Sequence, residues 1–140
     1  MISYSFENGL NIHEITALYS KQEMALYHGD MAELAAGLAN STMMTARDEG
    51  RLVGMIRGVS DMHTVLFIDE LIVLPEYSED NVDQELLGQF LDYFKQIDRV
   101  VAVSEDGHLR KLLEKEGFKD SDNHGARCMI RPRKLLEIRY

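Results

Sequence analysis

Two adjacent carboxylates interrupt the most apolar stretch of the sequence. The stretch TVLFIDELIVLP runs from Thr64 to Pro75, and Asp69 and Glu70 are its charged residues. Charged side chains are seldom buried without a partner, and neighbouring residues of a strand point to opposite faces. Each acid therefore needs a reason of its own. Pairing with Arg57 or Arg51 of a neighbouring strand, a strand bulge, and work as a general base all remain open.

A second acidic feature follows directly along the chain. The segment EYSEDNVDQE, residues 76–85, contains five carboxylates and no Lys or Arg. It leads into the amphipathic helix expected over Gln84 to Phe94, and helix N-termini attract anions such as phosphate through free N–H groups and the helix dipole. Here Asp80 or Asn81 can serve as the N-cap and Asp83 can sit in the first turn. The helix entrance therefore already has anions of its own.

Hydrophobic periodicity predicts the elements that position these acids. Asn11 is expected to cap a helix that reaches about Leu26, with Ile12, Ile15, Leu18 and Tyr19 on one face; Asp30 is expected to cap a second helix. Further strands are predicted over Ile2 to Phe6, Thr42 to Arg47, Leu52 to Val59, Arg99 to Ser104 and Ala126 to Arg131, with a helix over His108 to Glu116 that ends at Gly117. The order β-α-α-β-β-β-α-β-α-β predicts a mixed sheet with helices on both faces.

Length and composition set further bounds. A chain of 140 residues with 45% apolar and 28% charged residues predicts one globular domain over residues 1–140. The net charge of −9 argues against nucleic-acid binding. The sequence shows no secretory signal and no membrane-spanning stretch, so we expect a cytoplasmic protein without a membrane partner. The five histidines have no metal-ligand spacing, so no metal is expected, and the one cysteine, Cys128, is expected to be packed in a strand.

The order of elements, together with LIVLPEY at Leu71 to Tyr77 and LLEKEGF at Leu112 to Phe118, resembles the GNAT superfamily of acetyl-CoA-dependent N-acetyltransferases. The resemblance covers nearly the whole chain. It implies an α/β (α+β) GNAT-like acyl-CoA N-acyltransferase fold, in which about four helices flank a mixed central sheet of about six or seven strands. It also implies acetyl transfer from acetyl-CoA to an amine of a small molecule or peptide.

The resemblance assigns roles to particular residues. Main-chain groups of Ile72 and Val73 would bond to the pantetheine arm of acetyl-CoA, with Ser104 on the facing strand. The family's pyrophosphate loop, of pattern Gln/Arg-x-x-Gly-x-Gly/Ala, falls on Ser78, Glu79, Asp80, Asn81, Val82 and Asp83. Glu70 matches the position of an acidic residue near the acceptor amine, and it becomes the candidate general base.

The sequence departs from the family pattern at two places. Ser78, Asn81 and Asp83 stand where the loop pattern has Gln or Arg and two glycines. Asn tolerates the conformations that glycine supplies better than most residues do, whereas Asp83 is a poor substitute. Leu113 stands at the position of the Tyr that usually acts as general acid, which makes His108 the candidate for a substitute acid.

Two hypotheses follow, with a third beside them. The chain is an N-acetyltransferase that tolerates an altered loop, or it is a non-catalytic relative that has lost acetyl-CoA binding and acts as a binding or interaction module. A different acyl donor without a diphosphate is the third. A homodimer through the last strand or the tail also stays open.

Overall fold

The computed structural model describes residues 1–22, 30–104, 107–120, 125 and 127–131. The chain divides into two compact units, Met1–Val103 and Ser104–Tyr140. The first unit contains a β-sheet and its covering helices, and the second contains one described helix.

The sheet of the first unit has its strands in the spatial order β1-β2-β3-β4-β5. The first four strands pair antiparallel and β5 runs parallel to β4, which makes the sheet mixed as predicted. The described residues form five strands, fewer than the six or seven expected. Their bounds are β1 Ile2–Glu7, β2 Thr42–Asp48, β3 Arg51–Ser60, β4 Val65–Val73 and β5 Arg99–Ala102.

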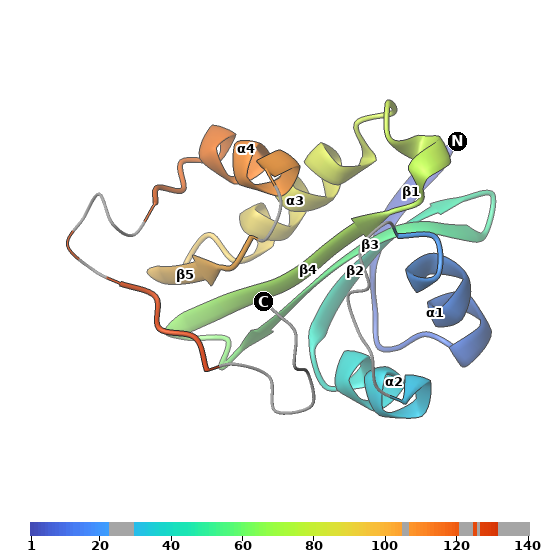
Figure 1. The fold of residues 1–140 in the computed structure, drawn as a ribbon, viewed down its shortest axis with the longest axis horizontal. Helices are drawn as coiled ribbons and strands as arrows, with labels where there is room; N and C mark the ends of the chain where they lie inside the picture. The colour runs from blue at the N-terminus through green and yellow to red at the C-terminus, as the bar shows by residue number, and fades with distance from the viewer. Residues whose placement is uncertain (23–29, 105–106, 121–124, 126, 132–140) are drawn as a thin grey trace. The chain divides into compact units, whose positions relative to one another are not determined.

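Helices lie on both faces of this sheet (Figure 1). Helices α1 (Ile12–Tyr19) and α2 (Met31–Ala39) cover one face, and α3 (Val82–Tyr93) lies on the other and packs on β2, β3 and β4. A short 3₁₀ turn, η1 (Pro75–Tyr77), joins β4 to the loop before α3. Only this turn and a short loop separate the end of β4 from the start of α3.

Side-chain caps begin both of the early helices where the sequence predicts them. The Asn11 side chain accepts a hydrogen bond from the Glu14 amide at 2.8 Å, and Asp30 accepts one from Ala32 at 2.8 Å. Helix α1 ends at Tyr19 rather than near residue 26, because the side-chain amide of Gln22 bonds to the Leu18 carbonyl at 3.0 Å and closes the last turn. Residues 23–29 lie outside the described part of the chain.

The core forms where α3 crosses the centre of the sheet. Leu66 and Ile68 of β4 and Phe90 of α3 are at most 2% exposed. Gly58 of β3 permits this close packing, because a Cβ there would lie 2.8 Å from Leu66 Cδ1 and 3.2 Å from the Phe90 ring. On the opposite face of the sheet, Ile15, Leu18 and Tyr19 of α1 are buried, while Ile12, expected to share that face, is 47% exposed.

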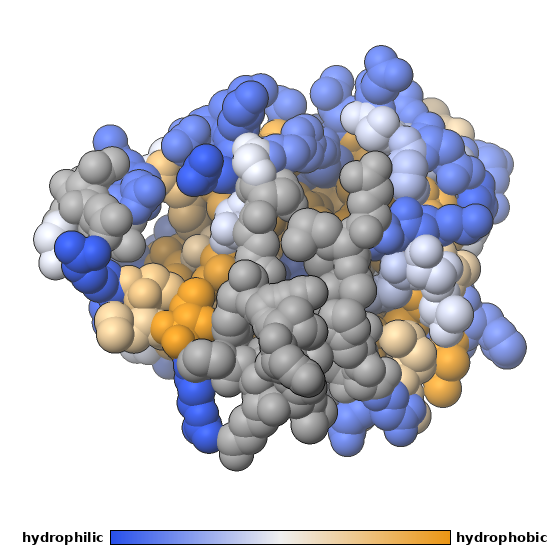
Figure 2. Space-filling view, viewed as in Figure 1, coloured by the Kyte–Doolittle hydropathy of each residue, from blue (hydrophilic) through white to orange (hydrophobic). Residues whose placement is uncertain are grey.

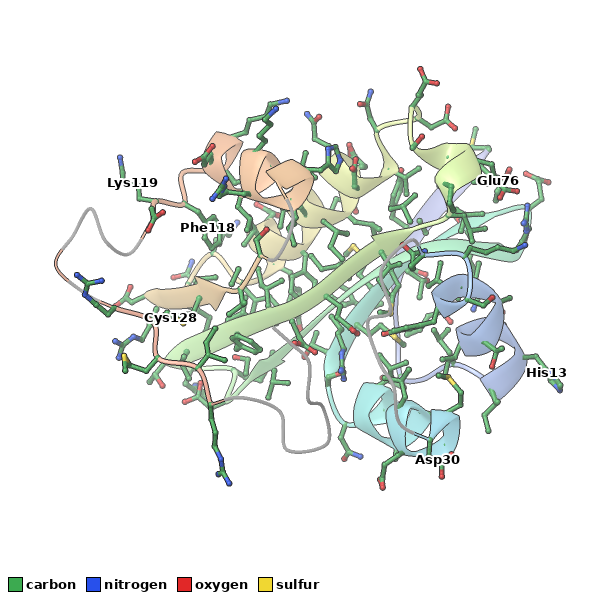
Figure 3. The ribbon with its side chains drawn as sticks, in the orientation of Figure 1. His13, Asp30, Glu76, Phe118, Lys119 and Cys128 are labelled. Carbon is green, nitrogen blue, oxygen red and sulfur yellow. The ribbon has the colours of Figure 1, made fainter. Side chains whose placement is uncertain are left out.

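The second unit contains α4 (Gly107–Lys115), which buries Leu112 and Leu113 and is followed by Gly117 at φ +95°. Only glycine adopts that conformation without strain, so the predicted helix end is confirmed. The predicted strand over 126–131 is wrong for its described part: residues 127–131 are exposed and not in a strand. Cys128 is exposed (Figure 3), contrary to the expected packing, because the described residues 127–131 form no strand that could bury it.

Polar and charged residues cover much of the coloured surface in Figure 2. Among the described residues, no helix is long and apolar enough to cross a membrane.

Candidate active site

A β-bulge brings the two acids of β4 to one arginine. Arg57 of β3 pairs with Glu70, whereas Gly58 pairs with Ile68, so Asp69 is an extra residue on β4. The expectation that neighbouring side chains face opposite ways fails here because the bulge breaks the alternation. Arg57 Nη2 lies 2.9 Å from Asp69 Oδ2, and Arg57 Nε lies 3.3 Å from Glu70 Oε1. Both the pairing with Arg57 and the bulge, two of the readings that the sequence left open, are thus present.

Glu70 lies in a nearly closed environment. Its side chain is 12% exposed, and the hydroxyl of Tyr19 donates a hydrogen bond to Oε1. Burial raises the pKa of Glu70; the Tyr19 hydrogen bond and the charge of Arg57 oppose this rise, and the charge of Asp69 adds to it. A carboxylate with a raised pKa holds a proton more firmly than an exposed one and is suited to general-base work.

Tyr19 comes from the last turn of α1 and is 9% exposed. Burial and the neighbouring charge of Glu70 raise the pKa of its hydroxyl, so the hydroxyl remains a protonated donor. The sequence placed Tyr19 on the buried face of the helix but gave it no site role. The sequence did contain a clue to this contact. A buried Tyr hydroxyl normally needs a hydrogen-bond partner, and Glu70, a charged residue in an apolar strand, also needed a partner.

The backbone of the loop before α3 has a glycine-like conformation at one of the two positions where the family pattern has glycine. Asn81 adopts a left-handed conformation, φ 57° and ψ 25°, which suits the position where the family pattern has its first glycine. Asp83 is the second residue of α3 and has helical backbone, so this position does not require a glycine. Asn81 is the N-cap residue by position, yet its side chain makes no capping hydrogen bond.

Several amides of this loop are engaged within the chain. The Ser78 amide bonds to Pro75 O at 3.1 Å, and the Asp80 amide bonds to Tyr77 O at 3.1 Å. The Gln84 amide bonds to Asp83 Oδ1 at 2.7 Å. These three amides therefore already have oxygen partners within the chain.

The loop also carries a negative field. Burial raises the pKa of the Tyr4 hydroxyl on β1, and the charges of Glu85, Asp80 and Asp83 add to the rise. The negative charges of these three carboxylates therefore disfavour a further negative charge on Tyr4. They would repel a phosphate at the same helix entrance in the same way.

The remaining predicted residues lie at the end of β4 or in the second unit. Ile72 is 2% exposed, and the Val73 carbonyl lies 3.4 Å from the side-chain amide of Gln22. Ser104 opens the second unit and His108 is the second residue of α4; their roles, and those of the loop residues, stay predictions. The described residues contain no group of three or more His, Cys, Asp or Glu that could hold a metal ion.

Comparison with known proteins gives the family. The profile of the acetyltransferase (GNAT) domain matches residues 15–131. No curated protein matches the chain. The chain therefore belongs to the GNAT acetyltransferases.

Solved structures agree on the fold. A GNAT-family acetyltransferase from Streptococcus pneumoniae is 24% identical, with a TM-score of 0.80 over 96% of this chain and 99% of its own. A putative GNAT acetyltransferase from Xanthomonas campestris is 19% identical, with a TM-score of 0.80 over 99% and 98% of the two chains. AAC(6')-Iy, solved with a bisubstrate analogue of CoA and acetylneamine, is 17% identical, with a TM-score of 0.64 over 97% and 99%.

Proposed function

We propose that this protein transfers an acetyl group from acetyl-CoA to a primary amine of a small molecule or peptide, with Glu70 as the general base. The observation that carries the proposal is the buried carboxylate of Glu70, held by Tyr19 and Arg57 at the bulge of β4. Membership of the GNAT family and the CoA bisubstrate analogue bound to one structural neighbour support acetyl-CoA as the donor.

In the proposed reaction, the acceptor arrives as an ammonium ion, which is not a nucleophile. Glu70 takes one proton, directly or through a water, and the amine nitrogen then forms a bond to the thioester carbonyl carbon. The carbon–sulfur bond breaks and its electron pair leaves with the sulfur. The nitrogen, now bonded to the acetyl group, releases its second surplus proton to solvent, and the sulfur is protonated to the thiol. We assign His108 as the acid for that last proton, since Leu113 cannot donate one.

Two features of the site favour an amine substrate. Two carboxylates share one guanidinium, so the cluster has a formal charge of −1 and attracts a cation. Asp69 is 38% exposed, and it lies beside the more buried Glu70. An ammonium ion can therefore meet an exposed acid next to a buried base.

The acid-rich loop favours a second function, in which the chain keeps the fold but binds no acetyl-CoA. Three loop amides already have partners within the chain, and the surrounding acids repel a diphosphate. On this alternative the protein serves as a binding or interaction module.

Ligand-induced stabilisation and turnover separate the two functions. Thermal unfolding is followed with and without acetyl-CoA, and thiol release is followed with a panel of primary amines. At a thousandfold excess over its dissociation constant, a ligand stabilises the fold by about 4 kcal/mol, so a functional site gives a clear rise in melting temperature. The proposal fails if acetyl-CoA leaves the melting temperature unchanged and no amine releases thiol; the same result supports the non-catalytic alternative.

A further inference from the structure

The two contacts of Glu70 described above fall on the same oxygen and differ in kind. The Tyr19 hydroxyl donates a hydrogen bond to Oε1. Arg57 Nε lies 3.3 Å from the same oxygen, but this buried nitrogen has no hydrogen-bond partner among the described residues. Arg57 thus lowers the pKa of Glu70 more by its charge than by hydrogen bonding, whereas Tyr19 supplies a directed hydrogen bond.

We propose that Tyr19 is a positioning residue for Glu70: its hydroxyl fixes Oε1 and leaves Oε2 to accept the proton from the acceptor amine. The catalytic half of this proposal rests on the acetyl transfer proposed above. The structural half, a hydrogen bond that sets the state of Glu70, does not depend on any activity.

The backbone around Tyr19 is suited to such a role. Its helix begins with the Asn11 cap, and the Gln22 side chain closes its end and reaches the Val73 carbonyl of β4 at 3.4 Å. The last turn of α1 is therefore tied to the strand that carries Glu70. A hydroxyl on a helix end that is bonded to the neighbouring strand defines the orientation of the carboxylate more narrowly than a long arginine side chain would.

Helix α2 completes the enclosure from a second side. A Cβ at Gly37 would lie 3.5 Å from Arg57 Nη1, so the backbone of α2 passes close over the guanidinium. Among the described residues, the charged and titratable groups that contact Glu70 or share its arginine are Tyr19, Arg57 and Asp69. Of these, Tyr19 can be changed without altering the charge of the cluster.

The test compares Tyr19→Phe with Tyr93→Phe, a matched control on the 53% exposed tyrosine of α3. The titration of Glu70 is followed by carbon NMR of its carboxyl group, assigned by the signal that disappears in Glu70→Gln. Because the hydrogen bond favours the charged carboxylate, Tyr19→Phe should move the Glu70 midpoint to higher pH, and Tyr93→Phe should leave it in place. The acidic limb of kcat/KM should move with the midpoint, and a midpoint that rises by about one pH unit lowers the rate on that limb about tenfold.

A second variant guards against loss of folding in Tyr19→Phe. Difluorotyrosine at position 19 keeps the ring and strengthens the donor, so the Glu70 midpoint should move to lower pH. A Glu70 midpoint that both variants leave unchanged overturns the proposal, as does a rate that falls equally at every pH. If the midpoint moves as expected while the wild-type protein transfers no acetyl group, the hydrogen-bond role stands and the proposed function fails.

Discussion

The molecule contains two acidic regions that treat their carboxylates differently. At the bulge of β4, Asp69 and Glu70 share Arg57, and Glu70 is nearly buried under Tyr19. At the entrance of α3, Glu79, Asp80 and Glu85 are exposed. Burial changes the proton affinity of a carboxylate, whereas exposed acids mainly set a local field. The first region therefore contains a carboxylate with an altered proton affinity, and the second sets a negative local field.

The two acidic regions also differ in the irregularity of their backbone. The bulge at Asp69 places a second acid beside Arg57, while the left-handed Asn81 gives the loop a turn that a glycine usually supplies. In the first region the irregular backbone assembles a charged cluster. In the second, the left-handed Asn81 is surrounded by acidic side chains.

The largest effect is expected for Glu70→Gln. Loss of the base should lower kcat/KM for amine acetylation by about 10²–10⁴-fold, while the amide keeps an oxygen that can accept from Tyr19. The matched control is Glu49→Gln, at a side chain 80% exposed in the β2–β3 turn. Initial rates of thiol release measure both variants. Full activity in Glu70→Gln would show that the buried carboxylate is not the base.

The loop acids should have the next largest effect. The triple variant Glu79→Gln, Asp80→Asn, Asp83→Asn removes charge without changing side-chain size, and we expect CoA to bind more tightly. Like charges about 4 Å apart repel by about 1 kcal/mol in water, and each 1.4 kcal/mol corresponds to about a tenfold change in affinity. Isothermal titration calorimetry at low salt gives the dissociation constants of CoA for the wild type and for the triple variant.

A triple control distinguishes the local field from the net charge. Glu33→Gln, Asp98→Asn, Glu116→Gln removes the same number of charges at exposed residues that are not part of the loop. If this control improves CoA binding as much as the loop variant does, the helix entrance has no special effect. The gain should also shrink in about 0.5 M salt, since the screening length is then only a few ångströms.

A smaller effect is expected from the loop backbone. Asn81→Ala should lower the free energy of unfolding by about 1 kcal/mol, because left-handed backbone costs an L-residue about that much. Asn81→Gly should stay within about 0.5 kcal/mol of the wild type, because relief of strain offsets the greater freedom of the unfolded chain. Urea denaturation measures both, with Gln89→Ala on the exposed side of α3 as the control. An Asn81→Ala variant as stable as the wild type would contradict the left-handed assignment.

The sequence predicted the features that depend on a few neighbouring residues. The caps at Asn11 and Asp30 and the helix end at Gly117 follow from local chemistry, and all are present. Local signals also gave the order of the five strands along the chain. Each of these features has its cause within a few residues, so a single sequence contains the information.

The features that the sequence left open or missed depend on distant contacts. The bulge at Asp69 is set by how β3 and β4 pair, and the closing of α1 involves a bond from Gln22 back to Leu18 and across to β4. The partnership of Tyr19 with Glu70 spans 51 residues. Period-two and helical patterns do not encode such contacts, so the sequence offered Arg57 only as one of several alternatives and did not give Tyr19 as the partner of Glu70.

The smallest expected effect is on the pH dependence of stability. It involves two carboxylates, Glu7 and Glu70, whose pKa values shift in opposite directions. Hydrogen bonds from Arg47 lower the pKa of Glu7, and the Thr45 hydrogen bond adds to them against the effect of burial, whereas burial raises the pKa of Glu70. Glu7 therefore stabilises the fold above its ordinary pKa, and this contribution is lost as pH falls through the lowered value. Glu70 favours the fold below its ordinary pKa, and this contribution is lost as pH rises through the raised value.

The measurement is the free energy of unfolding of the wild type, Glu7→Gln and Glu70→Gln between about pH 3 and pH 8. The wild type should lose stability relative to Glu7→Gln on acidification and gain it relative to Glu70→Gln. Slopes of the same sign would show that the hydrogen bond from Tyr19 and the charge of Arg57 outweigh the burial of Glu70. In that case Glu70 would be an ordinary ion-paired acid, and the contrast between the bulge of β4 and the entrance of α3 would reduce to exposure alone.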